Sequence, residues 1–477
     1  MKTKTILVLL ILLLAASALV MTGQNANFTG VIKEGENLRL AVPDFRGSGD
    51  AQKFMQVFND TLWNELDNGG VVTLVGKSFY PLNVPQRPED FVPPTGRGKS
   101  TGPWLADWSD PPVQANDLAF GYTAVQNGQL LLLGNLYNLS QPTPAQASLF
   151  GKRYIGSLDE NGARDVAREY AADILAQFGG KSLAGTKIYF VSDRSVAPRK
   201  LADGTIVSVK EIYSMDYDGS NQRQLTFYKS LSSQPAVSAD GKMFAFTSYP
   251  QNMANGHMAD ENPKIIIHSV EPDRRLNFYN QESSIVETPE FTPDGKHILF
   301  ATKNGGEKDP KIYMSTLQGG ELTRISNANA VEVEPKVNPK TGTDLVFISG
   351  RTGHPQLWKM GIDGSGAKML TDGTGEAANP CWSPNGQWVA FAWTRGFTYG
   401  QYNIFVMNMV TEKWDQLTHD TGDNENPTWA PDGLHLVYSS KRNRVTQIFT
   451  MLANGSHVQQ LTTQGNNSQP VWTKGIN

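Results

Sequence analysis

The segment "NENPTWAPDGLHLVYSSKRN" (Asn424–Asn443) contains two prolines four residues apart, a Pro-Asp-Gly turn and an apolar, strand-like run. Proline fixes φ and has no N–H donor, so it is normally excluded from the interior of a sheet. A second segment, "NPCWSPNGQWVAFAWTRG" (Asn379–Gly396), has the same order of features. Two such segments in one chain indicate a structural repeat.

The repeat recurs every 43 to 54 residues over the C-terminal part of the chain. Its units begin with Pro235, Pro289, Pro335, Pro380, Pro427 and Pro470. Each complete unit continues with a turn, an apolar strand such as "HILFAT" (297–302), a third strand such as "NIFVMNM" (403–409) and a polar fourth strand that carries Leu-Thr. Four antiparallel strands per unit of this length are typical of a β-propeller blade. We expect each of these prolines to be the first residue of an innermost strand, where no ladder donor is needed.

Five complete units and one split unit predict six blades. The final segment "QPVWT" (469–473) is an innermost strand with no further strands behind it. Its partners are predicted upstream, in "KIYFVSDR" (187–194), "EIYSMDYDG" (211–219) and "RQLTF" (223–227). The C-terminal strand therefore closes the ring, which removes the free sheet edges of an open array.

Residues 37–180 lack the repeat and predict a separate α/β domain. Strands are predicted within 37–45, 71–76, 117–125, 129–137 and 148–156. One helix is expected from Asp50, as its cap, to Gly69, and another from a capping box at Ser157–Glu160 to Gly179. The Pro/Gly-rich segment Pro85–Pro112 is expected to be a mobile loop. The predicted fold is thus an N-terminal α/β domain followed by an all-β six-bladed β-propeller over residues 181–477.

The N-terminus has the features of a secretory signal peptide. Lys2 and Lys4 precede an apolar run, Ile6–Ala16, and small residues follow at 16–18. The run is shorter than the roughly 20 residues that span a bilayer, although a membrane anchor is the alternative. We assign residues 1–18 to the signal peptide and 19–36 to an extended arm, which predicts export.

Composition argues against several functions. The formal net charge of −4 predicts no basic face for nucleic acid. Cys381 is the only cysteine and is expected to be a small buried residue; with no Cys/His ligand cluster, neither metal nor cofactor is predicted. The segment "GRGKST" (96–101) lacks the first glycine of a phosphate-binding loop. Trp382 and Trp429 are expected to pack between blades.

The whole chain resembles the TolB family of periplasmic proteins. The resemblance is carried by the repeated blade pattern, as in "NPCWSPNG" (379–386), behind a domain that opens with "LRLAVPDF" (38–45). It implies a non-enzymatic, monomeric component of the Tol–Pal system in the periplasm. Such a protein helps to keep the outer membrane intact and to constrict it during cell division, and associates with that membrane peripherally through its partners. The resemblance also implies that the propeller binds the lipoprotein Pal and that the arm binds TolA.

The loops that lead into the innermost strands of a propeller converge on one mouth of its channel, where partners commonly bind. The residue before each unit-opening proline is polar: Gln234, Thr288, Glu334, Asn379, Asn426 and Gln469. These side chains could bind a partner or cap the loop backbone. The resemblance places the loops before Pro289 and Pro335 against Pal, which selects Ile285, Thr288, Val333 and Glu334.

Two other classes of function remain open. A propeller peptidase would need a hydrolase domain with a nucleophile motif, which the sequence lacks. A propeller glycosidase would need two carboxylates across the channel, and Glu334 has no evident partner. These two are enzymes; the second class is a module that binds peptidoglycan or another glycan.

Overall fold

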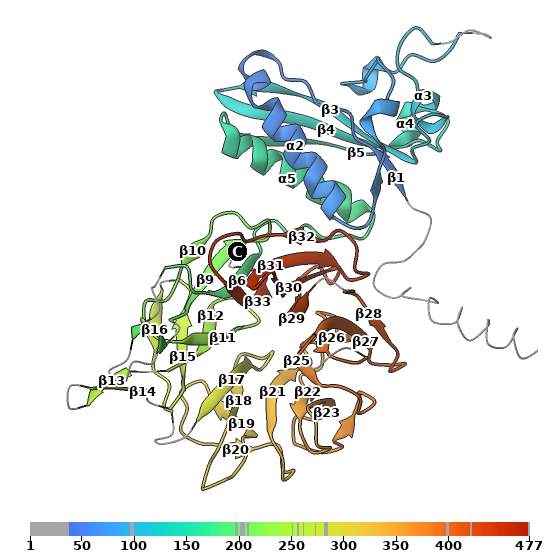
Figure 1. Ribbon diagram of the computed structural model, residues 1–477. Coiled ribbons are helices and arrows are strands. Elements are labelled where there is room, and N and C mark those ends of the chain that lie inside the picture. Colours follow the sequence, from blue (N-terminus) through green and yellow to red (C-terminus); the bar gives the residue numbers. More distant parts are fainter. Residues whose placement is uncertain are drawn as a thin grey trace, which may run out of the picture.

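The computed structural model describes residues 38–475 except 96–99, 196–198, 201–205, 208, 250, 255–256, 261, 272, 281–284, 397–399 and 420–421. The predicted signal peptide and arm lie outside the described residues. Figure 1 shows an α/β domain beside a ring of six small sheets. Among the described residues, no helix is both long and apolar enough to cross a membrane.

A mixed five-stranded sheet, in the order β2-β1-β3-β4-β5, forms the N-terminal domain. Its strands are β1 (Arg39–Ala41), β2 (Thr73–Leu74), β3 (Asp117–Gln126), β4 (Gln129–Asn138) and β5 (Ser148–Ser157). β1 pairs in parallel with β2 and β3, whereas β3, β4 and β5 are antiparallel. The predicted α/β architecture is confirmed, with β1 and β2 shorter than their predicted segments.

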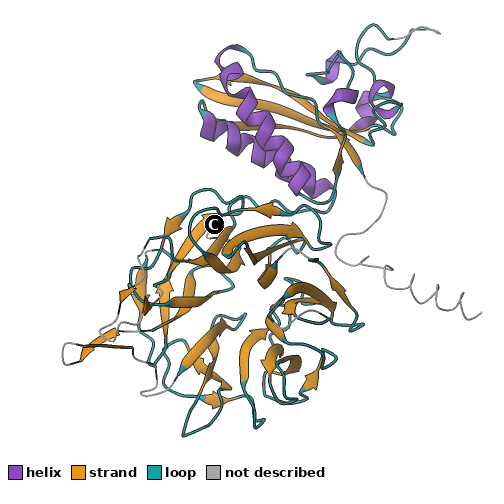
Figure 2. Cartoon of the chain, in the orientation of Figure 1, coloured by secondary structure: helices purple, strands orange, loops and turns teal. Residues whose placement is uncertain are grey.

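Two long helices, α2 (Met55–Asn68) and α5 (Glu160–Gln177), cover one face of this sheet (Figure 2). Phe58, Leu62 and Leu66 recur at helical spacing on α2 and are fully buried against the sheet and α5. α2 ends at Gly69, as predicted.

The predicted caps of both helices were wrong, although α5 begins at Glu160, within its predicted start. A 3-10 helix, η2 (Gly49–Phe54), precedes α2, and Asp50 lies inside its first turn instead of capping α2. α5 is capped by Asp159, whose Oδ1 accepts a hydrogen bond from the N–H of Gly162 at 2.8 Å, and not by Ser157. Several polar residues near a helix start can cap it, so sequence spacing alone does not choose among them.

In its described part, the Pro/Gly-rich segment 85–112 contributes buried side chains to the core of the domain, although it was predicted to be a mobile loop. It contains η4 (Pro88–Asp90) and α3 (Ala106–Ser109); η3 (Lys77–Phe79) and α4 (Pro144–Ala147) lie outside it. Phe91, Leu105 and Trp108 are buried against the sheet face opposite the long helices. Prolines and glycines hid these three apolar residues because they interrupt any regular spacing.

The second domain is a six-bladed propeller, as predicted; each blade is a four-stranded antiparallel sheet. With strands given from the channel outward, the first two complete blades consist of β11 (Ser232–Val237), β12 (Met243–Ser248), β15 (Lys264–Ser269) and β16 (Arg274–Leu276), and of β17 (Val286–Phe291), β18 (His297–Thr302), β19 (Lys311–Thr316) and β20 (Thr323–Arg324). The next two consist of β21 (Glu332–Val337), β22 (Asp344–Ser349), β23 (Gln356–Gly361) and β24 (Lys368–Met369), and of β25 (Ala377–Trp382), β26 (Trp388–Trp393), β27 (Asn403–Asn408) and β28 (Trp414–Gln416). The fifth consists of β29 (Asp423–Trp429), β30 (His435–Arg442), β31 (Val445–Leu452) and β32 (Gln459–Gln460). Two small hairpins, β7 (Arg199–Lys200) with β8 (Ile206–Val207) and β13 (Gln251–Ala254) with β14 (His257–Asp260), are additional to the blades.

The sixth blade joins the two ends of the propeller. Its order is β33-β6-β9-β10, where β33 (Asn467–Thr473) is the C-terminal strand and β6 (Lys187–Ser192), β9 (Glu211–Asp216) and β10 (Arg223–Gln224) come from the start of the domain. β33 pairs antiparallel with β6, for example Trp472 with Ile188. The predicted closure of the ring is confirmed.

The unit-opening prolines lie at β-bulges. In β17, Glu287 pairs with Ala301 and Glu290 with Leu299, so Thr288 and Pro289 together oppose a single residue. The other five innermost strands have the same register shift. Pro289 is therefore the fourth residue of its strand, and its predicted position at the strand start was wrong. A bulge leaves one residue out of the ladder, so a proline is tolerated there.

Threonines after the fourth strands tie four of the six blades together. The Oγ1 atoms of Thr226, Thr371, Thr418 and Thr462 accept hydrogen bonds, at 2.8 to 3.1 Å, from N–H groups of the third strands, those of Ile212, Leu357, Ile404 and Ile448. In three of these blades, β24, β28 and β32 end directly before the Leu-Thr pair that was predicted to lie within them. In these three blades the Leu-Thr pair therefore marks a threonine side-chain hydrogen bond and not a paired position of the fourth strand.

Arginines at the ends of three second strands provide another link. Arg194, Arg351 and Arg442 each donate through Nε to a serine two residues earlier, at 3.0 to 3.1 Å. Each guanidinium also lies over an aromatic ring of its own blade, 4.1 to 5.0 Å from the centroid. Arg351 pairs in addition with Glu332 of the innermost strand, a carboxylate that is fully buried. These contacts hold the innermost strands, which carry the candidate site.

Candidate functional site at the propeller channel

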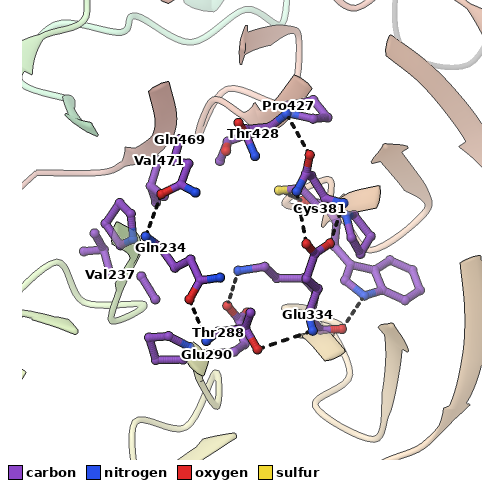
Figure 3. A pocket seen from close by; sticks show the side chains of 18 of the residues that line it. Gln234, Val237, Thr288, Glu290, Glu334, Cys381, Pro427, Thr428, Gln469 and Val471 are labelled. Atoms are coloured by element: carbon purple, nitrogen blue, oxygen red, sulfur yellow. Dashed lines mark hydrogen bonds and ion pairs between the residues drawn. The ribbon is translucent and has the colours of Figure 1, made fainter. Parts of the chain in front are cut away.

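Six residues, one from each blade, surround the channel: Gln234, Thr288, Glu334, Asn379, Asn426 and Gln469. We call this set the channel ring (Figure 3). All six have positive φ, between 51° and 54°, and each stands directly before a unit-opening proline. Non-glycine residues rarely adopt this conformation, least of all a β-branched one such as Thr288. The bulges therefore place strained, polar residues at equivalent positions around the axis.

Hydrogen bonds between blades run through the channel ring. The N–H of Thr288 donates to Oε1 of Gln234 at 3.0 Å, and the N–H of Glu334 donates to Oγ1 of Thr288 at 3.3 Å. The N–H of Asn379 donates to Oε2 of Glu334 at 2.5 Å, and the same pattern continues to the next blade. The bonded side chain always comes from the preceding blade, so the ring ties neighbouring sheets together.

The ring also crosses the junction where the propeller closes. The N–H of Gln234, in the first complete blade, donates to Oε1 of Gln469 at 2.7 Å. The hydroxyl of Thr428 donates to the carbonyl of Pro470 at 2.7 Å. At Asn426, the side-chain oxygen accepts from Oγ of Ser439, within the same blade, at 3.0 Å. Polar side chains thus support the C-terminal strand in its place.

The channel ring lines a cavity of about 240 Å³. Next to the ring, Glu290 and Lys336 form an ion pair of 2.8 Å across two blades, with the Sγ of half-buried Cys381 lining the same space. Burial raises the pKa of Glu290 and of Glu334, opposed in each case by the nearby Lys336 ammonium. Burial also raises the pKa of Cys381 to about 11, so this thiol is protonated and unreactive near neutral pH.

Further carboxylates lie near the ring. Glu425 precedes Asn426, and burial, followed by the charges of Asp423 and Glu334, raises its pKa to about 7. Glu287 precedes Thr288 and accepts a hydrogen bond from the Tyr249 hydroxyl at 2.8 Å. These groups give the region around the ring an acidic character above neutral pH.

The structure brings all six predicted polar residues together but places them differently from the prediction. They lie inside the innermost strands, at the bulges, and not in the loops before them. Glu334 is held by two hydrogen bonds from Asn379 instead of being free on an exposed rim. Side chains of the ring therefore accept hydrogen bonds from backbone N–H groups, which is the capping role that the sequence left open beside partner binding. Their predicted role in partner binding stays a prediction.

Ile285 and Val333, the other two predicted contact residues, are half-buried and lie close before the ring positions of their blades. Val333 packs partly against the core shared with the next blade, which includes Trp382. Trp429 packs in the following interblade core, so the predicted packing of both tryptophans is confirmed. The sequence reading missed Glu290 and Lys336, although both stand directly after a unit-opening proline.

Glu290 and Glu334 both line the cavity, so the channel holds a second carboxylate that the sequence reading did not find. Glu290 is bound by Lys336 and Glu334 by Asn379, so both have structural contacts within the propeller. The fold and the site together define the class of protein. It has an α/β domain followed by a closed six-bladed propeller, and hydrogen bonds join the polar residues of its channel ring.

Comparison with known proteins agrees with this class. The sequence model of the TolB beta propeller domain matches residues 179–395 and 365–475, so the chain belongs to this family. The Protein TolB homolog of Chlorobium luteolum is 29% identical over 247 residues, covering 52% of this chain and 49% of that protein. The Tol-Pal system protein TolB of Desulfosudis oleivorans is 27% identical over 298 residues, covering 61% and 57%. These matches thus span about half the length of the curated relatives.

A solved structure extends the likeness to the N-terminal domain. TolB from Acinetobacter baumannii superposes with a TM-score of 0.70 and covers 92% of this chain and 97% of its own. The sequence identity is 18%, so this likeness concerns the fold.

Proposed function

We propose that this protein is a non-enzymatic periplasmic scaffold of a Tol–Pal system, which helps to maintain the outer membrane and to constrict it during cell division. The observation that carries the proposal is the propeller of the TolB family with a polar channel mouth, preceded by an α/β domain in the order found in a solved TolB structure. A relative is named as a Tol-Pal system protein.

The first proposed partner is the lipoprotein Pal, bound as a folded protein at the channel mouth. A mouth lined by fixed polar groups is suited to a partner, because no side chain has to be ordered when the partner binds. We assign the contacts to Ile285, Thr288, Val333 and Glu334, with the remaining ring residues forming the rest of the surface. Since Thr288 and Glu334 also hold the ring and Val333 packs partly against the interblade core, Ile285 is the better position to test binding alone.

The second proposed partner is TolA, bound by residues 19–36 after cleavage of a signal peptide. This segment is polar and precedes the first strand of the domain, so it can be bound as an extended peptide. In this proposal the protein is an exported monomer that reaches the outer membrane only through its partners.

Binding of purified Pal and TolA to the full secreted protein tests both assignments. The rim variant Ile285→Arg is expected to bind Pal at least tenfold more weakly and TolA unchanged, because a cation on the rim disrupts a complementary surface. Deletion of residues 19–36 is expected to abolish TolA binding and to leave Pal binding unchanged.

The far surface provides a matched control. Val410 is 82% exposed at a blade turn, so Val410→Arg is expected to leave both affinities unchanged. Retention of both partners by the rim variant and the arm deletion would refute the scaffold assignment. Hydrolysis of peptides or glycans by the purified protein would favour the enzyme alternative, and binding of peptidoglycan without Pal would favour the glycan-binding alternative.

A further inference from the structure

A cluster of four side chains joins the N-terminal domain to the propeller. Glu65 on α2 accepts hydrogen bonds from Nε of Arg168 on α5, at 3.3 Å, and from the hydroxyl of Tyr217 in the turn between β9 and β10. Nη2 of Arg168 reaches across to Asp218 in the same turn at 3.2 Å. The guanidinium also lies 5.7 Å from the centre of the Tyr217 ring. One arginine is therefore shared between a carboxylate of its own domain and a carboxylate of the propeller.

Two further contacts of the junction near α2 are between uncharged groups. The amide of Gln459 donates to Oδ1 of Asn68 at 2.8 Å, and Leu452 lies against Gly70. The charged groups that act on Glu65 are thus Arg168 from α5 and Asp218 from the β9–β10 turn. Figure 1 shows the lower end of α2 close to the propeller, near β32.

Glu65 is exceptional among the acidic residues of the domain helices because its side chain is only 8% exposed. Burial raises its pKa to about 7, against the lowering effect of Arg168, and Asp218 raises it further. Tyr217 and the β9–β10 turn cover Glu65 from the propeller side. If the domains separated, the carboxylate would gain solvent, keep Arg168 and lose Asp218, so its pKa would fall towards the ordinary value of 4.5.

We propose that Glu65 is a proton-operated latch, which strengthens the docking of the N-terminal domain on the propeller when it is protonated and weakens that docking when it is ionised. The neutral acid removes the repulsion between Glu65 and Asp218 across the junction, while Arg168 keeps its pair with Asp218. The ionised carboxylate restores that repulsion and is itself buried, which opposes docking. The latch does not depend on the identity of any partner protein.

The direction follows from proton linkage. A group whose pKa is higher in the docked state binds more protons there, so lowering the pH favours docking. With values of about 7 when docked and 4.5 when free, the docking equilibrium changes by about 30-fold between pH 5.5 and pH 8.5. Below pH 4 the effect is complete, because Glu65 is then protonated in both states.

Distance measurements between the domains test the latch in the full chain. Spin labels on cysteines introduced at Gln129 and Val410 report the separation, since both positions are exposed and lie in different domains. The labelled protein also carries Cys381→Ser, which removes the half-buried native thiol from labelling. The expected result is a narrow distance distribution at pH 5.5 and a broader one, with a separated population, at pH 8.5.

Two variants decide whether Glu65 is responsible. Glu65→Gln is permanently neutral, so its distribution is expected to be narrow at both pH values. Asp67→Asn is the matched control: Asp67 lies two residues further on the same helix and is exposed, so this variant is expected to keep the wild-type pH response. Identical wild-type distributions at both pH values would overturn the proposal. So would a pH response in Glu65→Gln as large as that of the wild type.

Discussion

The N–H of Asn379 donates to Oε2 of Glu334, and the side-chain amide of Asn379 donates to Oε1 of the same carboxylate. The two residues belong to β25 and β21, in adjacent blades. One carboxylate thus joins two sheets at the centre of the propeller. Glu334 is consequently a structural member of the channel ring, whatever it contacts in a partner.

Removal of this carboxylate is expected to destabilise the propeller. Glu334→Ala leaves the Asn379 N–H without its acceptor, which lowers the free energy of unfolding by about 1–3 kcal/mol. Glu334→Gln keeps an acceptor oxygen and is expected to cost less. Denaturant unfolding of both variants measures the difference. Equal stability of Glu334→Ala and the wild type would show that the ring bonds contribute nothing.

The Arg351–Glu332 pair is expected to be far more sensitive to loss of one partner than of both. Glu332 is fully buried, and Arg351 lies 4.4 Å above the Trp358 ring. Arg351→Met leaves a buried charge unpaired, which costs about 3–5 kcal/mol. In Arg351→Met/Glu332→Leu no charge remains buried, and most of that loss is expected to be recovered. A double-mutant cycle in urea decides this: a double variant as unstable as Arg351→Met would contradict the pairing.

The six-bladed closure was predictable from the sequence because the repeat has several independent marks. Four of the six second strands, such as β18 (His297–Thr302), start and end where the sequence indicated, since they are short, uninterrupted and bounded by turns. The bulges were not predictable in the same way. A residue with positive φ before a proline is set by the twist and register of the innermost strand, and the sequence shows only that Thr288 and its equivalents are polar.

The residues of the channel ring could be predicted from the sequence, but the hydrogen bonds between them could not. The six ring positions could be found from their place in the repeat. Their connection depends on the inclination of neighbouring blades, a tertiary property that brings the Gln234 side chain to the Thr288 backbone, 54 residues away. Glu65 was missed for a related reason. It lies among exposed positions of an amphipathic helix and becomes buried only because a second domain covers it.

Ionisation of Glu425 is expected to make stability depend on pH. Burial raises its pKa to about 7, above the ordinary value of 4.5. The folded state therefore binds the proton more tightly than the unfolded state, so stability is present below pH 4.5 and is lost as the pH rises through 7. Glu425→Gln should therefore resemble the wild type at pH 4.5 and exceed it by about 1–3 kcal/mol at pH 8.5.

Urea unfolding at the two pH values tests this expectation. Glu412→Gln is a suitable control, because Glu412 lies in an exposed turn where its carboxylate pairs with Lys368. That variant is expected to show no stabilisation at high pH. A Glu425→Gln variant that is less stable than the wild type at pH 8.5 would mean that the ionised carboxylate stabilises the folded propeller.

The C-terminal strand is expected to be indispensable to the propeller. Deletion of residues 468–477 removes most of β33, so β6 loses its partner and becomes an open sheet edge beside the channel. It also removes buried Trp472, whose indole N–H donates to Oγ1 of Thr186 at 2.9 Å, and the Gln469 bond to Gln234. Loss of the tryptophan alone is worth about 3–5 kcal/mol. The truncated protein is therefore expected to unfold at much lower denaturant concentration and to associate through the open edge.

Deletion of 474–477 leaves β33 whole and is expected to have little effect, which separates loss of closure from loss of chain length. Thermal melting and light scattering of the two deletions measure both consequences. If the longer deletion melts at the wild-type temperature and stays monomeric, the C-terminal strand does not close the ring.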